Sequence, residues 1–213
     1  MAEETVAHMR ERRIVPNLET IRIANRIKPQ DVGITPAQYL PYGHGQVPPM
    51  AVWGDGYNVN HVSLVHHTDG NVGIYNPQVH FENVSRLYHK IEDNVDAIAR
   101  VEARELAGCR YVLICYGSVS RTGIEAVLEA REERGIPIGF IRLKTLWPFP
   151  EMQLRALVPE VETIFVPEMN LGMMKHSITE ALRDRCDRFI SIPSLGNLHS
   201  PEMILAKIYE EIP

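Results

Sequence analysis

The sequence predicts an α/β fold of three layers, in which helices flank a mainly parallel sheet and an irregular N-terminal arm precedes them. Three short apolar runs are rich in β-branched residues and too short for buried helices: Tyr111–Cys115, Ile138–Leu143 and Thr163–Val166. Between the first two, residues 119–134 place apolar side chains such as Ile124 and Val127 on one helical face and charges on the other. Strands that alternate with amphipathic helices are typical of parallel sheets.

The N-terminal part is expected to be a short helix followed by the arm. Residues 1–12 begin acidic and end basic, which suits the dipole of a helix. Residues 13–78 hold seven prolines, many glycines and only brief apolar pieces. Within them, His61–His66 predicts a short strand and His67–Gly70 a turn. Such a long irregular segment is expected to wrap over the α/β domain or a partner surface.

The rest of the chain predicts regular elements around the central βαβ region. Residues 81–106 show one continuous apolar helical face that stops before Gly108. A short helix is expected at Glu151–Leu157, a longer one at Leu171–Arg185, a strand at Arg188–Ile192 and a last helix from Pro201 behind Ser200 as N-cap. Val112, Ile138 and Ile164 should lie side by side on neighbouring strands.

Length and composition limit the organisation and the function classes. We expect two parts, the helix and arm at residues 1–80 and the α/β domain with its leading helix at 81–213. A net charge of −5 without a basic run argues against nucleic-acid binding, and no apolar run is long enough to span a membrane. An odd number of cysteines without a CxxC pair predicts buried free thiols in a reducing cytoplasm.

Gly117, Ser118 and Arg121 form the first candidate site, where the first strand ends and a helix begins. Free N–H groups at a helix start, the helix dipole and an arginine suit a carboxylate or phosphate. In the alternative interpretation, Ser118 or Ser120 only caps the helix. The GxGxxG pattern of a dinucleotide site is absent from the sequence.

Glu168, Asn170 and Gly172 form the second candidate site, at the carboxyl end of another predicted strand. Ligands of open α/β sheets bind at that edge, where Glu168 would serve as an acid or base and Asn170 as a donor. Alternatively, Asn170 caps the next helix and Gly172 allows close packing.

Two further features have simpler explanations. His66 and His67 beside Asp69 suggest a metal or proton-transfer cluster, but adjacent strand residues point to opposite faces and no third ligand follows, so we predict no metal site. The apolar loop Trp147–Pro150 either contacts a partner or caps the sheet; we favour the structural role.

Several motifs in succession carry a family resemblance. YGSVSRTGIEAV, GIPIGFIRLKTLWPFP, VPEMNLGMM and HSPEMIL resemble, in that order, the alpha subunit of 2-oxoacid:ferredoxin oxidoreductases, in the domain similar to the C-terminal domain of transketolases. The match covers residue 109 to the C-terminus, with a weaker likeness through the arm back to ETVAHMRE.

The resemblance implies a role in an oxidoreductase complex. Such enzymes decarboxylate a 2-oxoacid on thiamine diphosphate with Mg, transfer the acyl group to coenzyme A, and pass electrons through iron–sulfur clusters to ferredoxin. The domain expected before Met1, which contacts the pyrimidine of the cofactor, is missing from this sequence. The resemblance implies that the diphosphate, magnesium and cluster sites belong to other subunits or domains of the complex. The implied partners of this chain are a beta chain, a gamma-type chain and ferredoxin. We therefore expect no catalytic residue and no cofactor bound by this chain alone.

Two hypotheses follow. The chain is an assembly part of such an oxidoreductase, dimeric and inactive alone, with 2-oxoglutarate favoured as the substrate. Alternatively, it is a free-standing module of the same fold that binds an anion or a protein and performs no catalysis. The matched positions Gly117, Ser118, Glu168, Asn170 and Gly172 are candidates for binding or interface contacts.

Overall fold

The computed structural model describes residues 7–59 and 64–212, and its contacts divide the chain into two compact units. One unit is built on Val95–Pro213 and the other is Arg10–Asn94. The sequence set the division at residues 80 and 81, and that domain boundary stays a prediction. The structure adds that the helix preceding residue 95 packs with the arm.

The unit from residue 95 onward contains a five-stranded sheet of order β1-β3-β2-β4-β5. Its strands are β1 (Val101–Arg104), β2 (Tyr111–Tyr116), β3 (Ile138–Leu143), β4 (Thr163–Glu168) and β5 (Phe189–Pro193). Strands β2 to β5 are parallel, and β1 pairs antiparallel with β3 at the edge. The predicted mainly parallel α/β sheet is thus confirmed.

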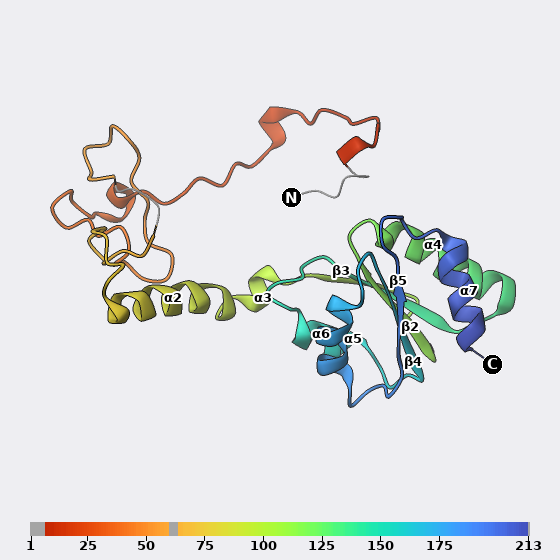
Figure 1. Ribbon diagram of the computed structural model, residues 1–213. Coiled ribbons are helices and arrows are strands. Elements are labelled where there is room, and N and C mark those ends of the chain that lie inside the picture. The colour runs from red at the N-terminus through yellow and green to blue at the C-terminus, as the bar shows by residue number, and fades with distance from the viewer. Residues whose placement is uncertain (1–6, 60–63, 213) are drawn as a thin grey trace. The chain divides into compact units, whose positions relative to one another are not determined.

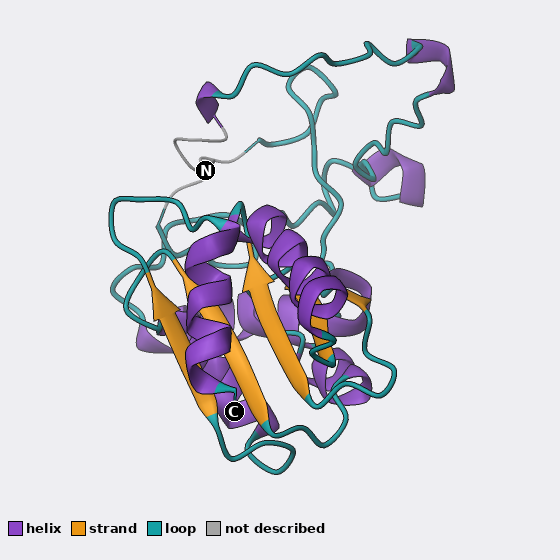
Figure 2. Cartoon of the chain, turned by 90° about the vertical axis from the view of Figure 1, so that its right-hand side faces the viewer, coloured by secondary structure: helices purple, strands orange, loops and turns teal. Residues whose placement is uncertain are grey.

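Helices cover both faces of this sheet, which gives the predicted three layers (Figure 1). They are α4 (Val119–Arg134), α5 (Glu151–Leu157), α6 (Met173–Leu182) and α7 (Pro201–Glu211). Helices α4 and α7 lie on one face, and α5 and α6 on the other (Figure 1). Figure 2 shows the strands side by side beneath the helices.

The central strands are apolar on both faces because both are covered. Leu113 and Cys115 of β2 pack with α4 and α7, whereas Val112 and Ile114 pack with α5 and α6. Gly123 lets α4 approach β2 closely, since a Cβ there would lie 2.7 Å from the Cys115 sulfur. All three cysteines are free and buried, as predicted, and burial raises the pKa of each thiol.

The element boundaries of this unit follow the sequence closely at most positions. Helices α4 and α5 and strand β3 have the predicted bounds, and Ser200 caps α7 by accepting a hydrogen bond from the Met203 N–H at 3.3 Å. Helix α6 is shorter than the predicted 171–185, and it ends at Leu182.

The single long helix predicted over residues 81–106 is wrong. The chain instead forms α2 (Pro77–Glu92), a short α3 (Val95–Ile98) and then β1. Val101 and Ala103 of β1 pack toward the α5 and α6 layer. The Glu102 carboxylate forms a salt bridge with the Lys144 ammonium, with Oε2 and Nζ 3.1 Å apart. Some apolar positions of this stretch fit both the period of a helix and the period of a strand, and the prediction followed the helical one. Gly108 (φ 67°) lies in the turn before β2.

The predicted register is correct for one pair and wrong for the other. Val112 lies opposite Ile164, but Ile138 lies opposite Tyr111, so Val112 faces Gly139. Because a shift of one residue moves a strand side chain to the other face, Ile138 packs with α4 and α7 instead.

The second unit, Arg10–Asn94, has little regular structure besides α2. It includes the short 3-10 helices η1 (Leu18–Thr20) and η2 (Pro29–Val32). Asn76 caps α2 by accepting hydrogen bonds from the N–H groups of Gln78 and Val79, and Val79 is the buried residue of this helix. The scarcity of helices and strands before α2 agrees with the predicted irregular arm.

Two predicted elements lie partly outside the described residues. Of the predicted helix over residues 1–12, the first six lie outside the described residues; Ala7 and His8 are helical and residues 9–12 are not. The first three residues of the strand predicted at 61–66 also lie outside them; residues 64 and 65 are not in a strand, and His66 forms an isolated bridge with Val72.

Leu113→Ala tests the core. Leu113 has no exposed surface in the central strand, so its truncation should lower the free energy of unfolding by about 2–5 kcal/mol. Urea unfolding measures it. Leu128→Ala, at a position 47% exposed on α4, is the control and should change the value by only about 0.5 kcal/mol. Equal losses in both variants would contradict the assigned core.

Candidate functional site

Both candidate sites lie where the direction of the chain connections reverses. From the adjacent strands β2 and β4, the connection through α4 leads to β3 and the connection through α6 leads to β5, on opposite faces. At such a point the loops at the carboxyl ends separate, and ligands of open α/β sheets bind there. The Ser118 hydroxyl lies 3.9 Å from the Met169 sulfur, which links the two loops.

Glu168, the last residue of β4, is completely buried. Its Oε2 accepts hydrogen bonds from the Met174 N–H at 2.8 Å and from the Tyr116 hydroxyl at 3.1 Å, and its Oε1 accepts from the Lys175 N–H at 3.0 Å. The carboxylate therefore sits at the start of α6, where unpaired N–H groups and the helix dipole favour negative charge.

Asn170 completes this network from the loop between β4 and α6. Its Oδ1 accepts hydrogen bonds from the N–H groups of Gly172 and Met173, both at 2.8 Å, and its Nδ2 donates to the Tyr116 hydroxyl at 2.7 Å. Gly172 has φ 96°, a conformation that L side chains rarely adopt. The Asn170 contacts fit the alternative in which its side chain caps the start of the helix, although Gly172 occupies the N-cap position. Close packing does not explain Gly172, because a Cβ there would lie 3.4 Å from its nearest neighbour, the Ser191 hydroxyl.

Tyr116 joins the two strands and was missed in the sequence. Its hydroxyl donates to Glu168 and accepts from Asn170, so it bridges the ends of β2 and β4. Burial and then the Glu168 charge raise the pKa of Tyr116 to about 12. The sequence did contain a signal for this contact, because Tyr116 lies at the end of one buried strand and Glu168 at the end of another.

The first candidate group makes fewer contacts. Gly117 has φ 60° and turns the chain from β2 into α4, while Ser118 occupies the N-cap position without a side-chain capping bond. The Arg121 guanidinium is exposed and lies 3.8 Å from the Met9 sulfur. The structure thus places Ser118 beside the loop that carries the second candidate site. No described contact joins Arg121 to that site.

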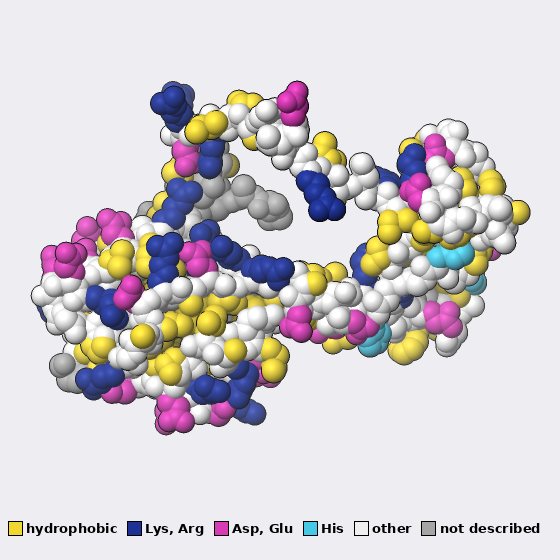
Figure 3. All heavy atoms as spheres, turned by 180° about the vertical axis from the view of Figure 1, so that it is seen from behind, with side chains coloured by type: hydrophobic (Ala, Val, Ile, Leu, Met, Phe, Trp, Pro, Cys, Tyr) yellow, Lys and Arg dark blue, Asp and Glu magenta, His cyan; other side chains and the backbone are white. Residues whose placement is uncertain are grey.

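Exposed apolar residues surround these polar groups on the loops that follow the parallel strands. We call Leu146, Trp147, Leu171, Met173, Leu195 and Leu198 the apolar strand-end surface, because they follow β3, β4 and β5 and so lie at the same edge of the sheet. Trp147 is 64% exposed, and Leu171 and Met173 are each 76% exposed. Figure 3 shows apolar side chains (yellow) at the surface of both units. Clusters of this kind mark interaction sites.

The histidine cluster is a packing feature in the described structure. The buried His66 ring bonds through Nδ1 with the Gly70 carbonyl at 2.9 Å and stacks on Tyr42. Within residues 7–59 and 64–212, no group of three His, Cys, Asp or Glu side chains could hold a metal ion. In the same part of the chain, no helix is long and apolar enough to cross a bilayer.

Three comparisons show which known proteins this chain is similar to. Residues 109–202 match the profile of the pyruvate:ferredoxin oxidoreductase core domain II, which covers β2 to the start of α7. These residues are therefore similar to that core domain.

Two curated relatives are similar to this chain along nearly its whole length. The 2-oxoglutarate synthase subunit KorA of Methanocaldococcus jannaschii is 38% identical over 204 residues, which are 95% of this chain and 52% of the relative. That of Methanothermobacter thermautotrophicus is 33% identical over 210 residues, 98% of this chain and 54% of the relative. The chain thus spans about half the length of these relatives.

A solved structure shares the fold. The 2-oxoglutarate:ferredoxin oxidoreductase from Magnetococcus marinus, with 2-oxoglutarate, coenzyme A and succinyl-CoA bound, matches with a TM-score of 0.73 at 24% identity. The match covers 93% of this chain and 34% of that one. Because 93% of this chain is covered, the match includes residues of the arm as well as the sheet.

Glu168→Ala tests the network. The variant leaves two N–H groups of α6 and the Tyr116 hydroxyl without their acceptor, so the free energy of unfolding should fall by about 3 kcal/mol. Urea unfolding measures the loss. Glu180→Ala, at an exposed position of the same helix, is the matched control. Two variants of equal stability would show that the network adds nothing.

Tyr116→Phe tests the raised pKa. A tyrosine with a folded pKa near 12 keeps its proton while the unfolded chain, with a pKa of about 10, releases it. The protein should therefore lose stability as the pH rises from about 10 to about 12, and Tyr116→Phe should weaken this loss. Unfolding midpoints across that range measure it. Tyr75→Phe, at a residue 94% exposed, should retain the wild-type slope.

Proposed function

We propose that this chain is part of the alpha subunit of a 2-oxoacid:ferredoxin oxidoreductase, which decarboxylates a 2-oxoacid to an acyl-CoA and reduces ferredoxin. The observation that carries the proposal is the similarity to KorA subunits over 95% and 98% of the chain, arm included. The core domain II over residues 109–202 supports it independently.

The proposed substrate is 2-oxoglutarate. Two KorA relatives align along nearly the whole chain, whereas the KorA subunit of Archaeoglobus fulgidus aligns over 62% of it and the ketoisovalerate oxidoreductase subunit VorB of Methanothermobacter marburgensis over 58%. An alignment that continues through the arm favours the KorA type, because the arm lies outside the shared core domain.

We assign this chain an assembly role in that enzyme. The apolar strand-end surface is the proposed contact with neighbouring subunits, since large exposed side chains such as Trp147 and Leu171 are stabilised when a partner covers them. The polar network would keep the loops that carry this surface in place. Binding or interface contacts remain proposed for Gly117, Ser118, Arg121, Glu168, Asn170 and Gly172.

The cofactors of such a complex do not fit the groups this chain offers. Iron–sulfur clusters are held by several cysteine thiolates close together, and no such group occurs among the described residues. Burial also raises the pKa values of the free thiols Cys109, Cys115 and Cys186. Magnesium needs grouped oxygen ligands, and the Glu168 carboxylate already accepts hydrogen bonds from the α6 N–H groups. Those N–H groups are therefore not free to hold a diphosphate. Thiamine diphosphate, magnesium, the clusters and coenzyme A are therefore proposed to bind elsewhere in the complex.

Reconstitution tests the function. The chain is combined with a thiamine-pyrimidine domain and a cluster-bearing beta chain, and reduction of a viologen dye is followed with 2-oxoglutarate, 2-oxoisovalerate or pyruvate. We expect coenzyme A-dependent reduction that is fastest with 2-oxoglutarate. Equal turnover by a complex that lacks this chain would refute the assembly role and favour a free-standing module.

Leu171→Asp tests the proposed interface. Burying an added carboxylate at the centre of an apolar contact is unfavourable, so affinity for the other subunits should fall at least about tenfold, as for other interface anchors. Calorimetric titration of the subunits measures the affinity. Leu128→Asp, on the exposed part of α4 away from the strand ends, is the matched control. Unchanged affinity in Leu171→Asp would place the contact elsewhere.

A further inference from the structure

A pocket of about 400 Å³ lies within the arm unit, and the proposed function does not use it. Its volume lies within the range of small-molecule sites, roughly 300–1,000 Å³. Apolar side chains, prolines and two tyrosines form most of the wall, and three cations complete it. The lining residues most relevant here are Arg26, Tyr39, Tyr42, Pro48, Arg86 and Lys90.

Hydrogen bonds hold the walls of this pocket together. The Tyr39 hydroxyl accepts a hydrogen bond from the Ala51 N–H at 3.1 Å, and the Met50 N–H donates to the Ile27 carbonyl at 2.9 Å. The Tyr42 ring stacks on His66 with centroids 5.3 Å apart. The pocket is therefore formed without a ligand, which reduces the ordering cost of binding.

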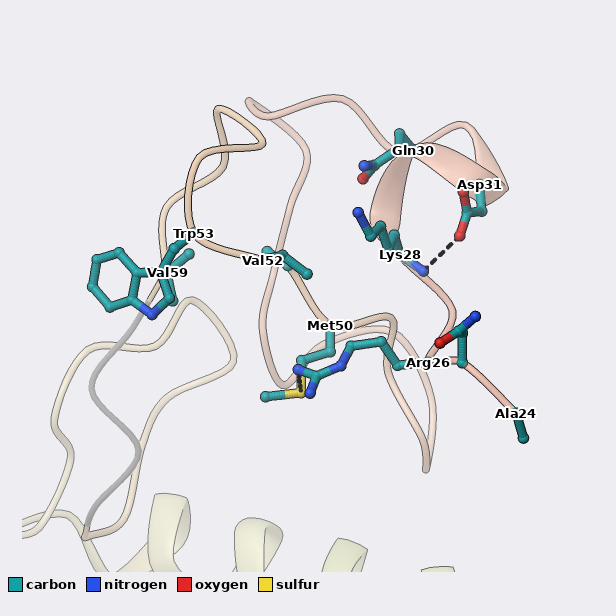
Figure 4. Close-up of a pocket in the computed structure, with 11 residues that line it drawn as sticks. Ala24, Arg26, Lys28, Gln30, Asp31, Met50, Val52, Trp53 and Val59 are labelled. Atoms are coloured by element: carbon teal, nitrogen blue, oxygen red, sulfur yellow. Dashed lines mark hydrogen bonds between the residues drawn. The ribbon is translucent and has the colours of Figure 1, made fainter. Parts of the chain in front are cut away.

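The three cations carry charge that no carboxylate neutralises among the described residues. Arg86 lies over the Tyr42 ring, 5.5 Å from its centroid, and donates to the Gln46 carbonyl at 3.4 Å. Arg26 contacts the Met50 sulfur at 2.8 Å (Figure 4). The described lining contains no Asp or Glu, and none of the three forms an ion pair in the described part of the chain.

Nearby Lys28 provides the contrast. Its ammonium lies 2.9 Å from Asp55, and hydrogen bonds from Gln30 and then Lys28 hold the pKa of Asp55 below its usual value. Lys28, Gln30 and Asp31 line an adjoining, larger hollow of about 1320 Å³ (Figure 4). It shares Arg26, Met50, Ala51 and Val59 with the pocket. In a chain of net charge −5, three cations gathered without an acid favour an anionic ligand.

We propose that this pocket binds a small organic dianion with an apolar body. Its carboxylate, sulfonate or phosphate groups bind Arg26, Arg86 and Lys90, and its apolar part lies against Tyr39, Tyr42 and the prolines. A bare inorganic ion would use the charges but leave the apolar walls uncovered, so an aromatic dianion is the appropriate probe. The site belongs to this chain alone and does not depend on the oxidoreductase assignment.

Calorimetric titration of the whole chain with naphthalene-1,5-disulfonate tests the site, with inorganic pyrophosphate as the probe of charge alone. One disulfonate should bind per chain, more tightly than pyrophosphate. Arg86→Gln and Lys90→Gln should each weaken binding about tenfold, because each removes one charge-assisted contact. Arg22→Gln removes the same charge from an exposed arm position outside the pocket lining and should change the affinity less than twofold.

The outcomes separate the possibilities. Equal weakening by Arg22→Gln and the pocket variants would mean diffuse attraction and overturn the proposal, as would undetectable binding to the wild-type chain. Arg86→Gln removes the contacts to Gln46 and Tyr42, so its folding is checked by circular dichroism. Lys90→Gln, whose ammonium has no ion-pair partner among described residues, provides the test if Arg86→Gln unfolds. Because no partner subunit is added, failure here leaves the assembly role untouched.

Discussion

The buried carboxylate of Glu168 connects three elements that separate segments of the chain contribute. It accepts hydrogen bonds from the start of α6 and from Tyr116 at the end of β2, while its own backbone ends β4. A buried charge is tolerated only when hydrogen bonds replace its hydration, and here helix N–H groups and a hydroxyl do so. The loops at the carboxyl edge thus have one arrangement that satisfies the carboxylate.

This constraint affects what the edge of the sheet offers to other molecules. The N–H groups of α6 that would hold an anion are already bonded to Glu168 and Asn170. What remains outward is apolar, with Leu171 and Met173 on either side of the helix start and Trp147 on the loop after β3. An edge of that kind suits contact with a protein surface better than capture of a charged metabolite.

The arm unit has the opposite character. Its cations Arg26, Arg86 and Lys90 line a preformed pocket without a described carboxylate partner, and its prolines and tyrosines supply the apolar wall. The proposed apolar contact at the strand ends and the proposed anion binding in the arm therefore belong to separate units of one chain. Each has its own test, because one needs partner subunits and the other needs only a ligand.

The sequence by itself determined the parallel sheet, the helices α4 and α5, the Ser200 cap and the motifs that resemble the oxidoreductase family. Those features depend on local periodicity, capping chemistry and linear order, which one chain displays directly. It did not determine β1, because Val101 continues the predicted helical face until pairing with β3 selects the strand. Only the tertiary structure decided that Glu168 faces inward and that Tyr116 meets it, since bonds between residues more than 50 positions apart depend on how β2 and β4 pair.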